Sequence, residues 1–533
     1  MSSVRRRERR QGSTHSPESS TAHGLGVFLL PLGFTALLLA LTLGSRVQAS
    51  PALGWSIWGS AAVLLAWMAT LVVQARAGGA PALEWGPARP QHYIQACCHL
   101  GIYTAWGWYW PPVAAFAPLL LAQLAFAYVF DILLAWSRRQ PYQLGFGPIP
   151  IVFSTNLFLW FKDDWFAWQF VLIALGFLGK AFVRWERDGR LVHIFNPSAF
   201  TLAIFSIVLL ATGTTDLTWG PEIASTFALG PRIYLTVFAI GLVVMYFFAV
   251  TPVTAMAAIT LFAGSALFGA VTGTPYFIDS EIPAAVFLGL HLLVTDPSTS
   301  PRTTLGRAIF GVGYGLGVMA LYAGLGALGL PTYYDKLLCV PLLNLLAPTI
   351  DRGVRALGDR PLLARLALTG PAGRFNLAHM AIWVVFFGAM TARGATDGTH
   401  QGDLLPFWQQ ACAENRTMAC DRLLRIEASY CADNAGWACN ELGRHHIEGR
   451  LVAADRERAL AYFARACEGR FQAGCLNLLD PDQALAAAPR PLDFRLLLRE
   501  GGPNLLEMPE PDLFARACRH GWSDACTRTT ASR

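Results

Sequence analysis

Residues 112–136 read PVAAFAPLLLAQLAFAYVFDILLAW, an apolar run in which Asp131 is the only charged residue. A membrane-spanning helix needs about 20 consecutive, mostly apolar residues, so this run is long enough to cross a bilayer. Similar runs recur on both sides of it as far as residue 393. They predict thirteen transmembrane helices, over residues 25–45, 54–75, 92–109, 112–136, 147–161, 165–183, 198–214, 232–249, 252–272, 281–295, 305–329, 336–351 and 376–393.

The composition of the whole chain favours the same interpretation. Of 533 residues, 54% are hydrophobic and 14% are charged, whereas a soluble globular protein carries about 25% charged residues. The low charge excludes a string of soluble domains, and the 33 Phe and 17 Trp exclude a disordered chain. The net charge of +6 comes from Lys and Arg beside the apolar runs, which is typical of membrane topology and not of a nucleic-acid partner. We therefore expect an all-α, polytopic membrane protein with the lipid bilayer as a partner.

The basic residues also predict the orientation. Residues 1–24 form a tail with five arginines among its first ten residues, and such a cluster stays in the cytoplasm. Thirteen crossings then place the Arg-rich linker 353–375 in the cytoplasm and residues 400–533 outside, which in a bacterial inner membrane is the periplasm. The start of the chain also resembles a signal peptide, but its apolar run is longer than usual, which favours an uncleaved anchor. Cleavage of residues 1–49 would leave the orientation unchanged.

The segment after residue 393 has ordinary charge density and contains eight of the 11 cysteines. A helix, a tight turn and an antiparallel helix would bring two cysteines of a C-x7-C pair within the 7 Å or so between Cα atoms that a disulfide requires. Free thiols in helical cores are the alternative. Zinc is not expected, because its sites favour shorter spacings and four converging ligands. The four pairs with this spacing are Cys412/Cys420, Cys431/Cys439, Cys467/Cys475 and Cys518/Cys526.

Within this segment, residues 438–443 read ACNELG, and further residues of the same pattern follow: Gly449, Asp455, Ala459, Tyr462, Ala466, Gly469 and Gly474. This pattern resembles the cysteine-rich, secreted variety of the Sel1-like repeat. The resemblance implies an α-solenoid of helix pairs over 400–533 that binds a periplasmic protein partner. His445 and His446 are expected to be an exposed, solvated pair, and no metal site is predicted.

Three polar segments interrupt the apolar runs of the membrane part. Residues 193–200 read HIFNPSAF, residues 293–301 read LVTDPSTSP, and residues 342–351 read LLNLLAPTID. Asn-Pro opens a helix, because proline tolerates the first turn and the Asn side chain accepts from free N–H groups. Polar residues inside a membrane bundle are costly and usually functional, although each segment alone could be a cap or a structural hydrogen bond.

Together these segments resemble the RnfD/NqrB family, the flavin-bearing membrane subunits of ion-motive electron-transport complexes, from about residue 128 to 352. The resemblance implies a ten-helix core of two repeats over 92–352, to which the helices of 25–91 and 376–393 are additions. It also implies a subunit of a redox-driven, ion-translocating oxidoreductase whose partners are other membrane subunits. The family marks are Lys180, Asn196, Pro197, Asp296, Pro297, Thr299, Gly306, Arg307, Asn344 and Asp351.

One family feature is not intact. The family attaches FMN to the threonine of an S-x-A-T motif in a long outer segment, whereas that segment is short here (215–231) and residues 223–229 read IASTFAL. Thr226 is the nearest match for FMN attachment. Non-covalent flavin, electron transfer through partners and loss of redox chemistry stay open. So do a flavin-free transporter or channel of the same fold and a membrane-anchored scaffold.

Other polar residues in the apolar runs are weaker signals. Asp131 and His291 could serve a proton or cation path, or could hydrogen-bond within the bundle. Cys97, Cys98 and His99 do not predict a metal site, because adjacent residues on a helix point about 100° apart. One helix end carries an aromatic cluster of Trp106, Trp108, Tyr109 and Trp110. The cluster predicts an aromatic belt at the membrane interface, and a platform for a quinone or flavin is the alternative.

Overall fold

The computed structural model confirms the all-helical class. Apart from two small sheets, regular structure in the described residues is helical. The structure describes residues 20–485 without 78–80, 86–89, 188, 229, 231, 279, 358–369, 371–372, 374, 397–399 and 433, together with residue 515.

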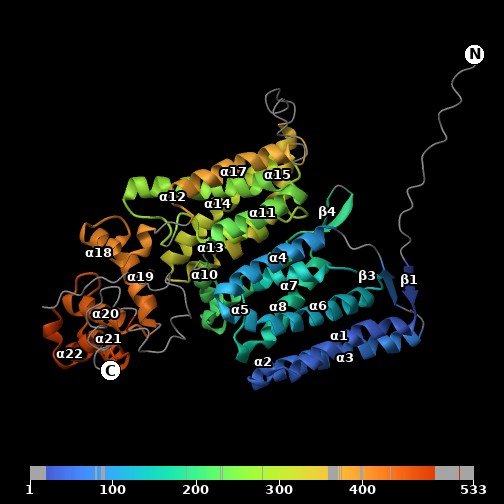
Figure 1. Cartoon of the computed structure of the whole chain (residues 1–533), viewed down its shortest axis with the longest axis horizontal. Helices are drawn as coiled ribbons and strands as arrows, with labels where there is room; N and C mark the ends of the chain where they lie inside the picture. Colours follow the sequence, from blue (N-terminus) through green and yellow to red (C-terminus); the bar gives the residue numbers. More distant parts are fainter. Residues whose placement is uncertain are drawn as a thin grey trace, which may run out of the picture.

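The bundle contains at least one helix in each of the thirteen predicted segments. Its helices are α1 (Leu29–Ala40), α2 (Ser45–Gln48), α3 (Pro51–Arg76), α4 (Pro90–Tyr109), α5 (Pro111–Ala115), α6 (Ala117–Ser137), α7 (Pro148–Asn156), α8 (Ala167–Phe182), α9 (Pro197–Thr212), α10 (Gly220–Ala228), α11 (Ile233–Phe248), α12 (Thr251–Thr272), α13 (Ala284–Leu292), α14 (Thr304–Ala327), α15 (Asp335–Ala356) and α17 (Asn376–Ala392). Figure 1 shows the long ones lying side by side, with α1 and α3 along one edge and α12 and α17 along the opposite edge.

Six helical spans in the described part of the chain are long and apolar enough to cross a membrane. A seventh candidate is the bent pair of α10 and α11, whose helices meet at 100°. Helices α8, α9 and α17 are apolar but shorter. The six spans are Leu25–Leu43, Pro51–Arg76, Ala117–Ser137, Thr251–Thr272, Thr304–Ala327 and Thr332–Ala356.

Two predicted spans, 147–161 and 281–295, are half-length helices in the structure. Both α7 and α13 have 9 residues, or about 13 Å of helix, less than half of a hydrocarbon core about 30 Å thick. After α7 the backbone bonds to other segments, as where the Trp219 N–H donates to the Trp160 carbonyl at 2.8 Å. The apolar run continues through this break, so hydropathy alone does not locate it.

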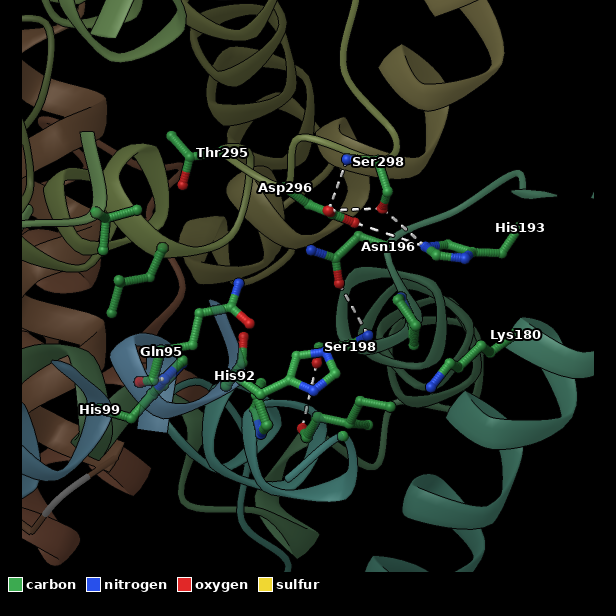
Figure 2. A pocket seen from close by; sticks show the side chains of 17 residues that line it. His92, Gln95, His99, Lys180, His193, Asn196, Ser198, Thr295, Asp296 and Ser298 are labelled. Atoms are coloured by element: carbon green, nitrogen blue, oxygen red, sulfur yellow. Dashed lines mark hydrogen bonds and ion pairs between the residues drawn. The ribbon is translucent and has the colours of Figure 1, made fainter. Parts of the chain in front are cut away.

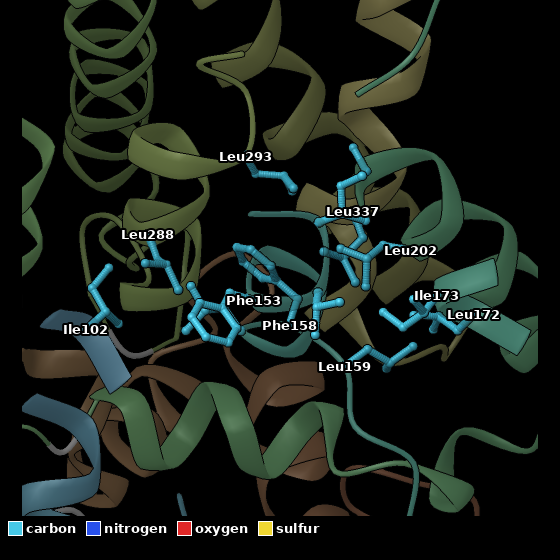
Figure 3. Packing of buried hydrophobic residues seen from close by; sticks show 14 of the residues in the cluster. Ile102, Phe153, Phe158, Leu159, Leu172, Ile173, Leu202, Leu288, Leu293 and Leu337 are labelled. Carbon is cyan, nitrogen blue, oxygen red and sulfur yellow. The ribbon is translucent and has the colours of Figure 1, made fainter. Parts of the chain in front are cut away.

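The half-length helices lie inside the bundle and not on its surface. Figure 3 shows apolar side chains of α7, α8, α9 and α13 meeting in one layer, including Phe153, Ile173, Leu202 and Leu288. Within a membrane, such helices associate through close packing and hydrogen bonds, because lipid is as apolar as the side chains. The layer therefore holds both short helices in the interior, with α7 packed against α9 and α13 packed against α11 and α12.

The aromatic residues at the end of α4 divide into two groups. Trp106 and Trp110 are buried, and the ring centroid of Trp106 lies 5.4 Å from that of Trp160 and 5.6 Å from that of Phe227. The predicted interfacial belt is wrong for these two residues, because α10, a helix that the sequence did not predict, covers the end of α4. Trp108 is 87% exposed, as a belt residue would be.

Two small sheets lie at the end of the bundle away from residues 400–485 (Figure 1). In the first, β1 (Ser20–His23) pairs antiparallel with β2 (Ala82–Trp85), which pairs in parallel with β3 (Tyr142–Leu144). The second is the hairpin of β4 (Arg184–Arg187) and β5 (Arg190–His193), with Arg184 opposite His193. The hairpin leads directly to the Asn-Pro turn that opens α9.

The C-terminal segment folds into helices that pack consecutively, each against the next. Three of the four predicted disulfides are confirmed, with Cα–Cα distances of 4.6, 4.7 and 4.5 Å for Cys412–Cys420, Cys431–Cys439 and Cys467–Cys475. The Cys518–Cys526 pair lies outside the described residues. The helices are α18 (Leu405–Ala413), α19 (Ala419–Ala432), α20 (Gly436–Glu448), α21 (Arg456–Glu468) and α22 (Gln472–Leu479).

The predicted exposure of His445 and His446 is wrong, because both side chains are buried. His445 Nε2 lies 2.9 Å from a carboxylate oxygen of Glu427 on the preceding helix. His446 stacks on Tyr462, with ring centroids 5.6 Å apart. The polar partners needed to bury these imidazoles come from neighbouring helices, which the local pattern does not reveal.

Beside this pair, the buried carboxyl group of Glu441 predicts a pH-dependent stability. Burial raises the pKa of Glu441 to about 7. A carboxyl group whose pKa is higher in the folded than in the unfolded state stabilises the fold at pH values below its unfolded-state pKa. This stabilisation is lost as the pH rises towards 7. Glu441→Gln should therefore stabilise the domain by on the order of 2 kcal/mol at pH 8 and change little at pH 4. Thermal unfolding at the two pH values measures this, with the exposed Glu457→Gln as control.

The C-terminal domain is attached to the end of the bundle that α12 and α14 form. The Arg422 guanidinium donates to the Tyr322 hydroxyl and to the Tyr276 carbonyl, both at 2.7 Å. The Arg416 guanidinium donates to the Gly273 carbonyl at 3.0 Å. These contacts involve the loop between α12 and α13 and the last turns of α14, so the domain lies at the end opposite the hairpin.

Candidate functional site

A polar cavity of about 160 Å³ lies where the half-length helices meet α4 and α9. Figure 2 shows its side chains converging from α4, α7, α8, β5, α9 and the loop that follows α13. Four of the family-motif residues line it: Lys180, Asn196, Pro197 and Asp296. The other lining residues are His92, Gln95, His99, Gly147, Pro150, Ile151, Ser154, His193, Ser198, Val244, Leu292, Thr295 and Ser298.

Asp296 is held at the cavity by hydrogen bonds from its own loop and from the hairpin. One carboxylate oxygen accepts from the Ser298 N–H at 2.9 Å and from the Ser298 hydroxyl at 2.6 Å, and the other accepts from Thr299 at 3.1 Å. His193 Nε2 lies 2.9 Å from the Ser298 hydroxyl and 3.8 Å from the carboxylate. Burial alone would raise the pKa of Asp296, but the interactions with His193 and Ser298 together lower it. The carboxylate is therefore ionised and oriented by these partners.

Asn196 joins three helices, as well as capping α9 as predicted. Its side-chain oxygen accepts from the Ser198 and Ala199 N–H groups, and its Nδ2 donates to the Leu293 carbonyl at 3.1 Å. Its backbone N–H donates to the side-chain oxygen of Asn344 on α15, also at 3.1 Å. The start of α9 is thereby fixed to the end of α13 and to the middle of α15.

Asp351 and Arg307 lie behind the cavity and fix the loop that carries Asp296. Asp351 forms a buried ion pair with Arg187 of the hairpin and accepts from the Arg302 N–H at 3.1 Å. Arg307 donates to the Pro301 carbonyl at 2.9 Å and to the carbonyls of the turn between α11 and α12. These residues position the loop and do not face the cavity.

Gly306 also supports this loop, and Pro297 is part of it. A Cβ atom at Gly306 would lie 2.6 Å from the Thr303 hydroxyl and 2.9 Å from the Pro301 Cβ, so the tight approach requires glycine. Pro297 follows Asp296 directly in the loop and is not among the cavity-lining residues. The residues of the predicted family motifs thus form two sets: one lines the cavity, and the other holds the loop that carries Asp296 in position.

Most of the α4 wall of the cavity was not predicted from the sequence. His92, Gln95 and His99 all line it, and their spacing of three and four residues places them on one face of a helix. That spacing was a usable signal, but His99 was considered only together with the adjacent Cys97 and Cys98, which were not expected to form a metal site. Within the described residues, no group of three or more His, Cys, Asp or Glu side chains could hold a metal ion.

The other two intramembrane candidates lie outside the cavity. His291 is 1% exposed; its Nδ1 bonds to the Phe287 carbonyl at 2.7 Å, and its ring packs against Trp383. Asp131 is hydrogen-bonded by Tyr142. Neither residue is among those that line the cavity.

The residues present do not fit a covalently bound flavin. The Thr226 side chain is only 5% exposed, and its hydroxyl donates to the Glu222 carbonyl within α10 at 2.6 Å. A phosphate ester would have to break this bond and displace the packing around it. The cavity is also small for a flavin, because ligand pockets usually measure about 300–1,000 Å³. A few waters or a small ion fit the space better.

Comparisons with protein-family models, with curated proteins and with solved structures found no match to this chain.

Proposed function

We propose that this chain is a membrane subunit of an ion-motive electron-transport complex of the RnfD/NqrB type, in which it supplies an ion path and not a flavin. The observation that carries the proposal is that two distant motifs line one polar cavity and a third is bonded to them. Asn196 and Asp296 both line the cavity, and the Asn344 side chain accepts a hydrogen bond from the Asn196 N–H. Buried polar groups at membrane depth are typical of ion and proton paths.

A two-repeat architecture supports the same proposal. The two half-length helices begin at Pro148 and Ala284. The interval between these two residues also separates Asn196, which precedes α9, from Thr332, which precedes α15. Asn196 donates to the Leu293 carbonyl just after α13, while the Tyr333 hydroxyl donates to the Phe158 carbonyl just after α7. Helices α4 and α11 pack together, as do α9 and α15. Inverted repeats with broken helices that meet at a central site are a common plan of membrane transport proteins.

The proposed orientation has the N-terminus in the cytoplasm and a Sel1-like α-solenoid in the periplasm of a bacterial inner membrane. The disulfides of this domain support it, because disulfides persist in oxidising compartments. In this orientation the predicted segments that contain α7 and α13 are counted among the thirteen crossings, and the cavity opens to the cytoplasm. The solenoid would then bind a periplasmic protein partner.

Purification of the full chain from native membranes in a mild detergent tests the proposed function. We expect other membrane subunits to co-purify and the denatured band of this chain to carry no flavin fluorescence. Asp296→Asn should leave the complex assembled but reduce ion movement per electron, and Asp164→Asn, at an exposed residue of the opposite end, is the matched control. Purification of the chain without any partner would contradict the proposal.

A stand-alone transporter of the same fold is the second candidate, and the position of the cavity between broken helices favours it. Such a position is typical of the substrate sites of transporters, and a volume of about 160 Å³ would admit only a very small solute. Solute uptake by liposomes that contain only this chain would support the transporter. Equal uptake after deletion of residues 400–533 would exclude a scaffold as the role of the whole chain.

A further inference from the structure

One wall of the cavity is a row of polar side chains along α4. His92, Gln95 and His99 lie on successive turns, so the row descends about 10 Å from near the start of the helix. In Figure 2, these three residues lie on one side of the cavity, whereas His193, Asp296 and Ser298 lie on the other. Lys180 is the remaining charged group, so the cavity holds three imidazoles, one ammonium and one carboxylate.

The innermost imidazole, that of His99, has a free lone pair. The side chain is 3% exposed, and its Nδ1 lies 2.6 Å from the Gln95 carbonyl. A carbonyl can only accept, so Nδ1 carries the proton and Nε2 of the neutral ring is an acceptor. Within the described residues, Nε2 has no hydrogen-bond partner, and the same is true of the hydroxyl of Ser154, which also lines the cavity. Buried polar atoms normally have a partner, so these two point to water or an ion in the cavity.

We propose that this cavity is a proton well that ends at His99. The proposal rests on the proposed function and names the proton as its ion. A hydronium ion in the cavity transfers its proton to His99 Nε2: the new N–H bond forms as an O–H bond breaks, and a water molecule remains. The reverse transfer restores the neutral ring. Asp296, at the opposite wall, offsets part of the positive charge that enters.

The lining favours a proton over a metal cation. Sodium and other hard cations prefer oxygen ligands, whereas the deepest acceptor here is an imidazole nitrogen. The Lys180 ammonium, which comes from α8, repels a metal ion held at a fixed site in the cavity, but a proton can pass along waters and imidazoles without occupying such a site. The titratable groups that share the cavity with His99 are His92, Lys180, His193 and Asp296.

The chain contains an internal control for this inference. His291 is as deeply buried as His99, bonds through Nδ1 to the carbonyl four residues earlier, and also has an unpartnered Nε2 among the described residues. It differs in one respect that matters, because it does not line the cavity. A comparison of the two histidines therefore separates access through the cavity from burial and ring geometry.

Deuterium exchange at the imidazole C2 carbon, followed by mass spectrometry on the full chain in detergent between pH 5 and 9, tests the proposal. We expect His99 to exchange about tenfold faster than His291 and to show a sigmoidal pH dependence. Ser154→Leu should fill the cavity and slow His99 to the rate of His291, whereas Ser154→Ala should leave the rate unchanged. Replacing potassium by sodium in the buffer should have no effect.

Two results would overturn the proton well. One is exchange at His99 that is as slow as at His291 or independent of pH, and the other is a His99 titration that shifts with sodium concentration. Because this measurement needs no partner subunit, it can fail while a complex co-purifies, and it can succeed when none does. Failure of the inference and failure of the proposed function are therefore distinguishable.

Discussion

Asp351→Ala is expected to lower the free energy of unfolding by about 3–5 kcal/mol, because it leaves the Arg187 guanidinium buried without its carboxylate. The two side chains are 2% and 7% exposed. The substitution also removes the acceptor of the Arg302 N–H, which begins the turn into α14. The loop that carries Asp296 should lose its position, and the cavity with it.

The thermal midpoint of the detergent-solubilised chain, followed by size-exclusion chromatography after heating, measures this effect. Arg352→Ala is the matched control, because that side chain is exposed and adjacent in sequence. The double variant Arg187→Met with Asp351→Leu should recover most of the loss, since replacing both partners leaves no unpaired charge. A single variant as stable as the unchanged chain would show that the ion pair does not hold the loop.

Reduction of the disulfides should unfold the C-terminal domain and leave the bundle folded. Each bridge closes a loop of nine residues and contributes about 2.5 kcal/mol by restricting the unfolded chain. Loss of all three that the structure describes should therefore cost about 7.5 kcal/mol, which is comparable to the whole stability of a small domain. We expect a protease to cleave residues 400–485 rapidly after reduction, while fragments of the bundle persist.

The pair variant Cys431→Ala with Cys439→Ala should reproduce part of this effect without a reductant, because both cysteines are buried in the domain core. Cys97→Ser is the control, since Cys97 is an exposed free thiol in the bundle. If the fully reduced domain resisted protease as well as the oxidised one, the bridges would have no role in its stability.

The sequence located the long helices well and the breaks poorly. Helices such as α6 and α12 end within a few residues of their predicted limits, because a bilayer requires a long apolar run and such a run is visible in composition. The ends of α7 and α13 depend on backbone hydrogen bonds to segments far along the chain, which hydropathy does not reveal. The same holds for α10, whose 9 residues lie in a segment expected to be a loop.

The candidate site was predictable in part for the same reason. Asn196 carries a local signal, the capping side chain before proline, and the structure confirms that cap. Arg187, the partner of Asp351, carries none, because the two residues are 164 positions apart and only the fold brings them together. His99 was visible in the sequence, but its significance depends on a cavity that several segments form jointly.

The attachment of the C-terminal domain by Arg416 and Arg422 has a mechanical consequence. Both arginines bind to the rim of α12 and α14, which belong to one half of the core. If that half tilts relative to the other, the domain must tilt with it, and its distance from the rotation axis enlarges the displacement. Spin labels on α20 and on α3 would then report the motion of the core.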